Sequence, residues 1–320
     1  MPVVSLSSYV PPRFFANAHV QTIYPTLLRR VRGIQYARER IDTPDGDFVD
    51  LDTSKVGAEK AAIILHGLEG DSSRAYILGM ARALNRKGWD ALAFNFRGCS
   101  GESNRTLRFY HSGETGDLQT VISHVIEKGG YTCLALVGFS LGGNVILKYL
   151  GERGQELSGR IWKAVVFSVP CDLASCSVKL GEPRNRIYMK RFLRMLRAKV
   201  RMKMELMPDL IDDDGYDLIT NFKEYDDRYT APMFGFKDAY DYWEKASSKP
   251  FLRNIAVPTL MVNAADDPFL AKECYPVEEA QHNPALFLEI PKNGGHVGFV
   301  AFNRDWEYWS ESRALQFLEA

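Results

Sequence analysis

One serine of the chain lies in a sequence context that suits nucleophilic catalysis. Residues 138–142 read GFSLG, so Ser140 stands between two glycines, after the apolar run 134–137 and before a stretch of helical periodicity. A G-x-S-x-G pentapeptide between a strand and a helix makes a sharp turn that holds the serine hydroxyl at the carboxyl end of a parallel sheet. The alternative is a plain tight turn into a helix. The position of the pentapeptide favours a nucleophile at Ser140.

A nucleophilic serine needs a base to take its proton and a carboxylate to orient that base. In the strand–turn–helix arrangement the chain order is serine, acid, histidine. The sequence Asp266-Asp267-Pro268 follows the apolar run 259–262, where a loop at the sheet edge would present an acid. We predict Asp267 as the acid because of its spacing from the strand end. Asp266 is the alternative, and Asp172, after an earlier strand, is the reserve candidate.

The predicted base is His296, which ends the sequence GGH after the apolar run 286–290. It is late enough in the chain and stands in a glycine-flanked loop after a strand. His282 precedes that run and is expected at the surface. The other four histidines all precede the serine: His19, His66, His111 and His124.

The anionic intermediate of acyl transfer needs at least two hydrogen-bond donors aimed at its oxygen. One expected donor is the backbone N–H of Leu141, directly after the serine. The second is the backbone N–H of Leu68, in the sequence HGLEG at 66–70 after the apolar run 61–65. A plain strand-to-helix turn is the alternative interpretation of that loop.

Short apolar runs alternate with amphipathic stretches along most of the chain, which predicts an α/β protein with a mostly parallel, buried sheet. The predicted strands are 61–65, 91–94, 134–137, 164–169, 259–262 and 286–290, and the predicted helices are 72–87, 116–128, 141–151 and 305–318. Segments 36–41 and 48–52 flank a Pro-Asp-Gly turn, so the sheet is expected to start with antiparallel strands.

The alternation stops between residues 172 and 249, which predicts a helical cap inserted into a core of residues 1–171 and 250–320, with 1–35 as an N-terminal arm. Residues 184–203 hold nine Lys or Arg and no acid, and residues 205–227 hold nine Asp or Glu and one Lys. The basic helix could contact an anionic membrane surface. We favour the alternative that its apolar stripe covers the active site while its charges meet solvent or the acidic segment.

Composition excludes several classes of protein. The 320 residues carry 40 Lys+Arg and 40 Asp+Glu, and this zero net charge argues against a nucleic-acid binder that works by whole-surface attraction. The five cysteines are scattered and show neither a disulfide pattern nor zinc-site spacing, so no metal is expected. A reducing, cytoplasmic location is expected for the same reason. No signal peptide or membrane span is evident.

The glycine-rich segment 98–101 lacks the lysine of a phosphate loop, so no nucleotide cofactor is expected. Cys99 within this segment is expected to be a small turn residue rather than a nucleophile.

Four further segments carry a resemblance: NAHVQTI at 17–23, HGLEG at 66–70, NFRGCSGE at 95–102 and YHSGET at 110–115. With them, the chain resembles the α/β-hydrolase fold and, within it, the YheT-like family. The resemblance implies helices on both faces of the central sheet and a serine hydrolase of carboxylic esters with short- to medium-chain acyl groups. It implies Ser140, Asp267 and His296 as nucleophile, acid and base. Arg97, His111 and Glu114, which fall in these segments, are expected to hold loops rather than to line the pocket.

The expected activity is therefore that of a cofactor-independent carboxylesterase acting on a small-molecule or lipid-like ester. The same triad would serve an alcohol acyltransferase, or a lipid hydrolase of monoacylglycerol or phospholipid. A binding module that kept the fold without catalysis is the alternative from another class, and the complete triad argues against it. The sequence does not set the oligomeric state.

Overall fold

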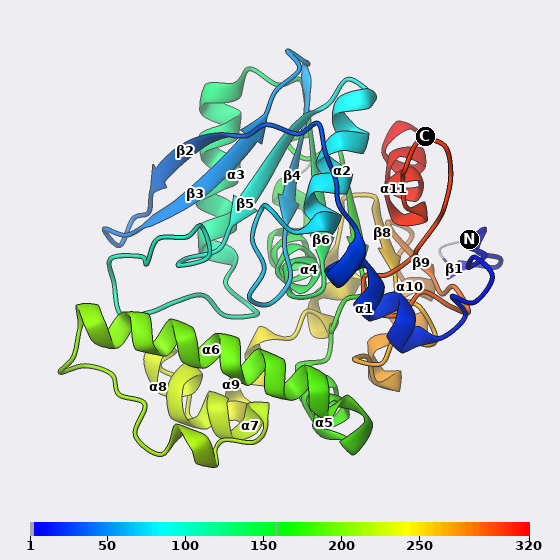
Figure 1. Cartoon of the computed structure of the whole chain (residues 1–320). Helices are drawn as coiled ribbons and strands as arrows, with labels where there is room; N and C mark the ends of the chain where they lie inside the picture. Colours follow the sequence, from blue (N-terminus) through cyan, green and yellow to red (C-terminus); the bar gives the residue numbers. More distant parts are fainter. Residues whose placement is uncertain (1–2, 158) are drawn as a thin grey trace.

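Nine strands form one sheet through the centre of the molecule (Figure 1). The computed structural model describes residues 3–157 and 159–320. The strand order is β1-β9-β8-β7-β6-β4-β5-β3-β2, so the strand that leads to Ser140 is the middle one of the nine. The strands are β1 (Val3–Val4), β2 (Ala37–Asp42), β3 (Phe48–Ser54), β4 (Lys60–Leu65), β5 (Asp90–Asn95), β6 (Cys133–Phe139), β7 (Lys163–Phe167), β8 (Thr259–Val262) and β9 (Leu286–Glu289).

In this spatial order, neighbouring strands run parallel from β1 through β9, β8, β7, β6 and β4 to β5. Strand β3 is antiparallel to both of its neighbours, β5 and β2. The predicted antiparallel start and the predicted parallel strands are therefore confirmed. Strand β1 was not expected. It is two residues long and pairs with β9. Two residues are too few to show the periodic pattern from which a strand is predicted.

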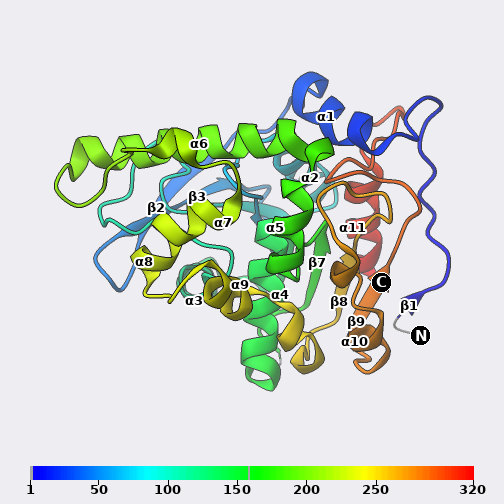
Figure 2. The same cartoon turned by 90° about the horizontal axis from the view of Figure 1, so that it is seen from below.

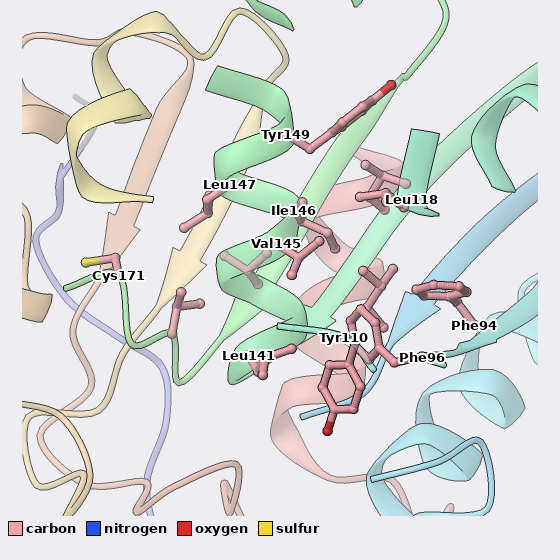
Figure 3. Packing of buried hydrophobic residues seen from close by; sticks show 14 of the residues in the cluster. Phe94, Phe96, Tyr110, Leu118, Leu141, Val145, Ile146, Leu147, Tyr149 and Cys171 are labelled. Carbon is pink, nitrogen blue, oxygen red and sulfur yellow. The ribbon is translucent and has the colours of Figure 1, made fainter. Parts of the chain in front are cut away.

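Helices cover both faces of the sheet, as predicted. The first layer is α2 (Ala75–Arg86) and α11 (Trp309–Glu319), and the second is α3 (Thr115–Gly129) and α4 (Leu141–Arg153). Successive residues of a strand point to opposite faces. In β4, Ile64 packs in the α2 and α11 layer, and its neighbour Ile63 packs in the α3 and α4 layer. Figure 3 shows the second layer, where Val145 and Ile146 of α4 lie among apolar side chains next to the central strands.

Between β7 and β8 the chain forms a helical layer that lies along one edge of the sheet (Figures 1 and 2). Its helices are α5 (Leu173–Gly181), α6 (Arg186–Leu206), α7 (Phe222–Tyr225), α8 (Ala231–Phe234) and α9 (Ala239–Ala246). Residues 172–249 are called the insertion below. Both views place α1 (Ala18–Leu28) beside the N-terminal end of α6, and a 2.9 Å hydrogen bond joins His19 Nδ1 to the Tyr188 hydroxyl there.

Several predicted boundaries differ from the structure, among them the start of α2, which is at Ala75 rather than at 72. The last helix begins at Trp309 rather than at 305, because Asn303 bonds to the backbone of Glu307 and Trp306 has a φ of 56°. Strand β7 ends at Phe167 rather than at 169, because Ser168 has a φ of 54°. A short helix, α10 (Val277–Gln281), was not predicted. None of the helices within the described ranges has both the length and the apolar character that crossing a bilayer requires.

Candidate active site

The backbone at Ser140 forms a strained turn between β6 and α4. Its φ of 52° and ψ of −120° lie outside the conformations that side chains other than glycine usually adopt. Its N–H donates to the carbonyl of Phe167 at 2.9 Å. The flanking glycines permit the turn, because a Cβ on Gly138 would lie 2.7 Å from Gly143 Cα and one on Gly142 would lie 2.6 Å from the His66 carbonyl.

The three residues predicted for the triad meet at this turn. His296 Nε2 lies 2.9 Å from Ser140 Oγ. His296 Nδ1 lies 2.9 Å from Asp267 Oδ2 and 3.1 Å from Oδ1. The Asp267 carboxylate can only accept when ionised, so it holds the proton on Nδ1 and leaves Nε2 free to accept from the serine. This geometry is the one that a nucleophilic serine, its base and an orienting acid require.

The imidazole of His296 is held by residues that the sequence did not single out individually. Its backbone N–H donates to Thr22 Oγ1 at 2.9 Å. The ring of Phe269 stacks on it, with centroids 4.1 Å apart and planes 28° apart. The next residue, Val297, donates to Ser168 Oγ at 2.9 Å. The only sequence signal for this support was the segment 17–23, which contains Thr22.

The alternative acids and base have other roles. Asp266 accepts from Gly295 N at 2.9 Å and from Asn293 Nδ2 at 3.2 Å, so it holds the loop that carries His296. Asp172 caps α5 by accepting from Ser175 N. His282 ends α10 and is exposed, bonding to the Glu278 carbonyl.

The loop after β4 approaches the serine closely. A Cβ on Gly67 would lie 3.1 Å from Ser140 Cβ and 3.6 Å from its Oγ. The N–H groups of Gly67 and Glu69 are each engaged by a tyrosine hydroxyl, whereas the N–H of Leu68 between them has no acceptor among the residues that the structure describes. Leu141 stands at the first position of α4, where a backbone N–H has no carbonyl partner within the helix. Its N–H is therefore also available as a donor.

His66 fixes the start of this loop. It is fully buried, and its Nε2 accepts from Phe96 N at 3.2 Å, so the proton sits on Nδ1 and is donated to the Gly67 carbonyl at 2.8 Å. Burial lowers the pKa of His66 to about 4, which keeps the ring neutral at pH 7. His66 is therefore a structural residue of the loop.

A buried ion pair ties the same loop to the insertion. Lys199 Nζ, on α6, lies 2.9 Å from Glu69 Oε1, and both side chains are almost fully buried. Tyr110 donates its hydroxyl to Glu69 Oε1 at 2.8 Å, and Arg74 donates to the Glu69 carbonyl at 2.9 Å. Glu69 has a φ of 53°, a strained conformation that these contacts maintain. The orientation of the Leu68 N–H is thus set before any substrate binds.

Among the residues of the other family segments, Arg97 and Glu114 hold loops, as expected. Arg97 is buried and bonds to Asp117 at 2.6 Å and to Asp45 at 2.7 Å. Glu114 caps α3. His111 also holds its loop, because its Nδ1 accepts from Gly113 N at 3.1 Å, but in addition it lines a cavity at the serine, which was not expected. Burial lowers its pKa to about 3.

Cys99 accepts from Lys199 Nζ at 2.9 Å. Burial raises the pKa of its thiol to about 11, which does not suit a nucleophile.

Two cavities meet at the serine. The first lies under the insertion and is called the insertion-side cavity. The second lies against α1 and the start of α2 and is called the α1-side cavity. Both are lined by Leu68, Glu69, Ser140, Phe192, Phe269 and His296. The insertion-side cavity is lined mainly by apolar residues, among them Leu173, Leu180, Leu196, Phe222, Met233 and Phe234.

A second buried carboxyl group, that of Asp226, lines the insertion-side cavity in addition to Glu69. Asp226 accepts from Trp243 Nε1 at 2.8 Å and from Thr230 Oγ1 at 2.6 Å, and no ion pair is found for it within the described ranges. Burial raises its pKa to about 7. The folded protein therefore binds this proton more tightly than the unfolded chain does, so Asp226 makes the free energy of unfolding fall as pH rises from about 4 to about 7.

Replacing Asp226 with asparagine removes this titration. We expect the difference in melting temperature, Asp226→Asn minus wild type, to be more positive at about pH 8 than at about pH 4. Thermal unfolding followed by fluorescence at both pH values measures the difference. Asp209→Asn, at an exposed carboxyl group, is the control and should show no such trend. A difference for Asp226→Asn that does not change with pH would contradict the prediction.

Comparison with known proteins supports the assignment of the fold. Residues 61–176 match the family model described as alpha/beta hydrolase fold. The chain is 36% identical to the YheT protein of Escherichia coli (strain K12), over 98% of this chain and 94% of that protein. The chain belongs to the YheT-like α/β-hydrolase family. This family member is also 32% identical to Phospholipase ABHD3 of Homo sapiens, over 93% of this chain and 75% of the relative.

Two further proteins extend the comparison of this YheT-like hydrolase. It is 29% identical to Monoacylglycerol lipase of Saccharomyces cerevisiae (strain ATCC 204508 / S288c), over 87% of this chain and 62% of that protein. The esterase Pf2001 of Pyrococcus furiosus superposes with a TM-score of 0.60 at 17% identity, over 99% of this chain and 98% of that one. The structural likeness shows the fold. The relatives support hydrolysis of esters or lipids as the general activity.

Proposed function

We propose that this YheT-like hydrolase cleaves carboxylic esters through an acyl-enzyme on Ser140. The observation that carries the proposal is the continuous chain of hydrogen bonds from Asp267 through His296 to Ser140 Oγ, at a serine that faces a largely apolar cavity. A serine hydroxyl bonded to a histidine ring nitrogen has an acceptor for its proton, which is what a hydroxyl needs in order to attack.

In the acylation half of the reaction, Ser140 Oγ attacks the ester carbonyl carbon while its proton passes to His296 Nε2. Asp267 stabilises the imidazolium that forms. The carbonyl oxygen becomes an oxyanion, and the N–H groups of Leu68 and Leu141 are the proposed donors to it. The intermediate then collapses, the bond to the alcohol oxygen breaks, and His296 returns the proton to the leaving alcohol.

In the deacylation half, water takes the place of the alcohol. His296 removes a proton from the water as it attacks the acyl carbon, and the proton then goes to Ser140 Oγ when the acyl bond breaks. The products are a carboxylic acid and the free enzyme. All groups needed for both halves belong to the chain itself.

The acyl group is proposed to occupy the insertion-side cavity. Its walls of leucine, phenylalanine and methionine favour an unbranched hydrocarbon chain, because burying each CH₂ group is worth about 0.8 kcal/mol. We infer an acyl chain of short to medium length. The names Phospholipase ABHD3 and Monoacylglycerol lipase, borne by two relatives, support a lipid-like ester as the more specific substrate.

A fluorophosphonate probe combined with an ester panel tests the proposal. The probe should react with one residue, and the mass shift should fall on the tryptic peptide 129–148, which contains Ser140. The purified protein should hydrolyse p-nitrophenyl esters, with rates that depend on acyl chain length, and prior labelling should abolish this hydrolysis. Labelling elsewhere, or undiminished turnover after complete labelling, would rule the proposal out.

A further inference from the structure

The nine basic residues of segment 184–203 differ in how they are paired. Lys199 and Lys203 point inward, where Lys199 pairs with Glu69 and Lys203 donates to the carbonyls of Asn104 and Thr106. Arg197 and Arg201 pair with Asp213 of the acidic segment, at 2.9 Å and 2.7 Å. Arg184 pairs with Glu182. The remaining four are exposed and have no ion pair with any residue that the structure describes: Arg186, Lys190, Arg191 and Arg194.

These four residues lie in the N-terminal half of α6, the half beside α1 (Figure 2). One of them, Arg191, lines the α1-side cavity. The acidic segment therefore neutralises the far half of the helix and leaves positive charge at the half next to the serine.

A second guanidinium group, that of Arg74, lines the same cavity. Arg74 stands directly before α2, and its Nη2 donates to the Glu69 carbonyl at 2.9 Å, which fixes it near the loop that carries Leu68. Its Nε has no hydrogen-bond partner among the described residues and lies 3.4 Å from Asp71 Oδ2, its one ion-pair contact.

The two guanidinium groups are close enough to repel each other. The pKa of Arg191 is lowered, first by partial burial and then by the charges of Arg74 and Arg194. Glu69, which also lines this cavity, pairs with Lys199, and the two guanidinium groups that face the cavity are stabilised when an anion enters. Guanidinium groups suit phosphate in particular, because each presents two parallel N–H donors and a phosphate offers several oxygens at once.

We propose that the α1-side cavity binds the alcohol half of the ester and that Arg74 and Arg191 bind a phosphate group on that alcohol. The inference rests on the proposed ester hydrolysis and adds the identity of the leaving group. The two cavities meet at Ser140 and His296, so an ester bound across them has its acyl chain in the apolar cavity and its alcohol in the cationic one. Its preferred substrate is an acylated glycerol phosphate or a similar phosphate-bearing ester.

Two soluble esters with the same acyl group test the leaving-group assignment: hexanoyl glycerol and hexanoyl glycerol phosphate. The wild type should have the higher kcat/KM for the phosphate ester. Arg191→Gln should lower kcat/KM for that ester by about tenfold and leave the value for hexanoyl glycerol within about twofold, because only the phosphate ester loses a charge-assisted contact. Arg74→Gln should also lower the preference for the phosphate ester, and because Arg74 bonds to the Glu69 carbonyl of the Leu68 loop, its kcat/KM for hexanoyl glycerol should fall as well. Arg186→Gln, at an exposed arginine of the same helix that does not line the cavity, is the matched control and should change neither value.

Equal losses on both esters in Arg191→Gln, or no preference for the phosphate ester in the wild type, would overturn the assignment. If the wild type hydrolyses neither ester, the proposed function fails, and calorimetric titration then tests the site alone. Glycerol phosphate should bind the wild type more tightly than inorganic phosphate does, and Arg191→Gln should lose that binding. No binding of glycerol phosphate, binding that Arg191→Gln retains, or tighter binding of inorganic phosphate would overturn the inference.

Discussion

Ser140→Ala is expected to reduce kcat for p-nitrophenyl ester hydrolysis by about 10⁶-fold, to the rate that binding and the oxyanion donors alone sustain. The substitution removes the oxygen that lies 2.9 Å from His296 Nε2 and leaves the backbone bond from residue 140 to Phe167 in place. The fold should therefore persist, with a melting temperature within a few degrees of the wild type. Steady-state kinetics and thermal unfolding measure the two effects.

The matched control for this variant is Ser112→Ala. Ser112 lines the insertion-side cavity, as Ser140 does, and its hydrogen bonds to Tyr242 and Asn144 use its backbone rather than its hydroxyl. Its replacement should leave kcat within severalfold of the wild type. If Ser140→Ala retained a rate comparable to that of Ser112→Ala, ester cleavage would have to use a different nucleophile.

Asp267→Asn is expected to lower kcat by about 10⁴-fold while the protein stays folded. An asparagine amide facing His296 Nδ1 favours the tautomer that carries its proton on Nε2, and that nitrogen then cannot accept from Ser140. Kinetics across a pH series, with thermal unfolding alongside, would separate this effect from a loss of fold.

The adjacent carboxylate provides the comparison. Asp266→Asn keeps an acceptor oxygen for Gly295 N, so its cost should fall on the loop and amount to a much smaller loss of kcat. Equal losses in the two variants would mean that the loop geometry, rather than orientation of the imidazole, accounts for the effect. A larger loss in Asp266→Asn would reverse the assignment of the acid.

Much of the site could be predicted because its residues follow strands. Runs of buried apolar residues indicated where β6, β8 and β9 end, and parallel strands bring such ends to one edge of the sheet. Ser140, Asp267 and His296 each stand just after one of these ends. The choice of Asp267 over Asp266 depended on its spacing from the strand end and on Pro268 after it, and in the structure Asp267 lies within hydrogen-bond distance of His296 Nδ1.

The support around the site could not be predicted, because it comes from residues distant in sequence. Thr22 bonds to His296 across 274 positions and Lys199 pairs with Glu69 on another element, and neither contact has a local signature. The charge pattern of 184–203 was visible in the sequence, but its division into paired and unpaired halves depends on how the acidic segment folds back on α6.

The position of β6 as the fifth of nine strands has a consequence for how the protein loses activity. Four strands lie on each side of it, so fraying at either edge, at β1 or at β2, leaves its hydrogen bonds to β4 and β7 intact. In native-state exchange with deuterated water, amides at sheet edges exchange through local openings, whereas those of a central strand exchange only when the whole domain opens. The amides of β6 should accordingly be among the last to exchange, and the turn at Ser140 should keep its geometry until the sheet itself comes apart.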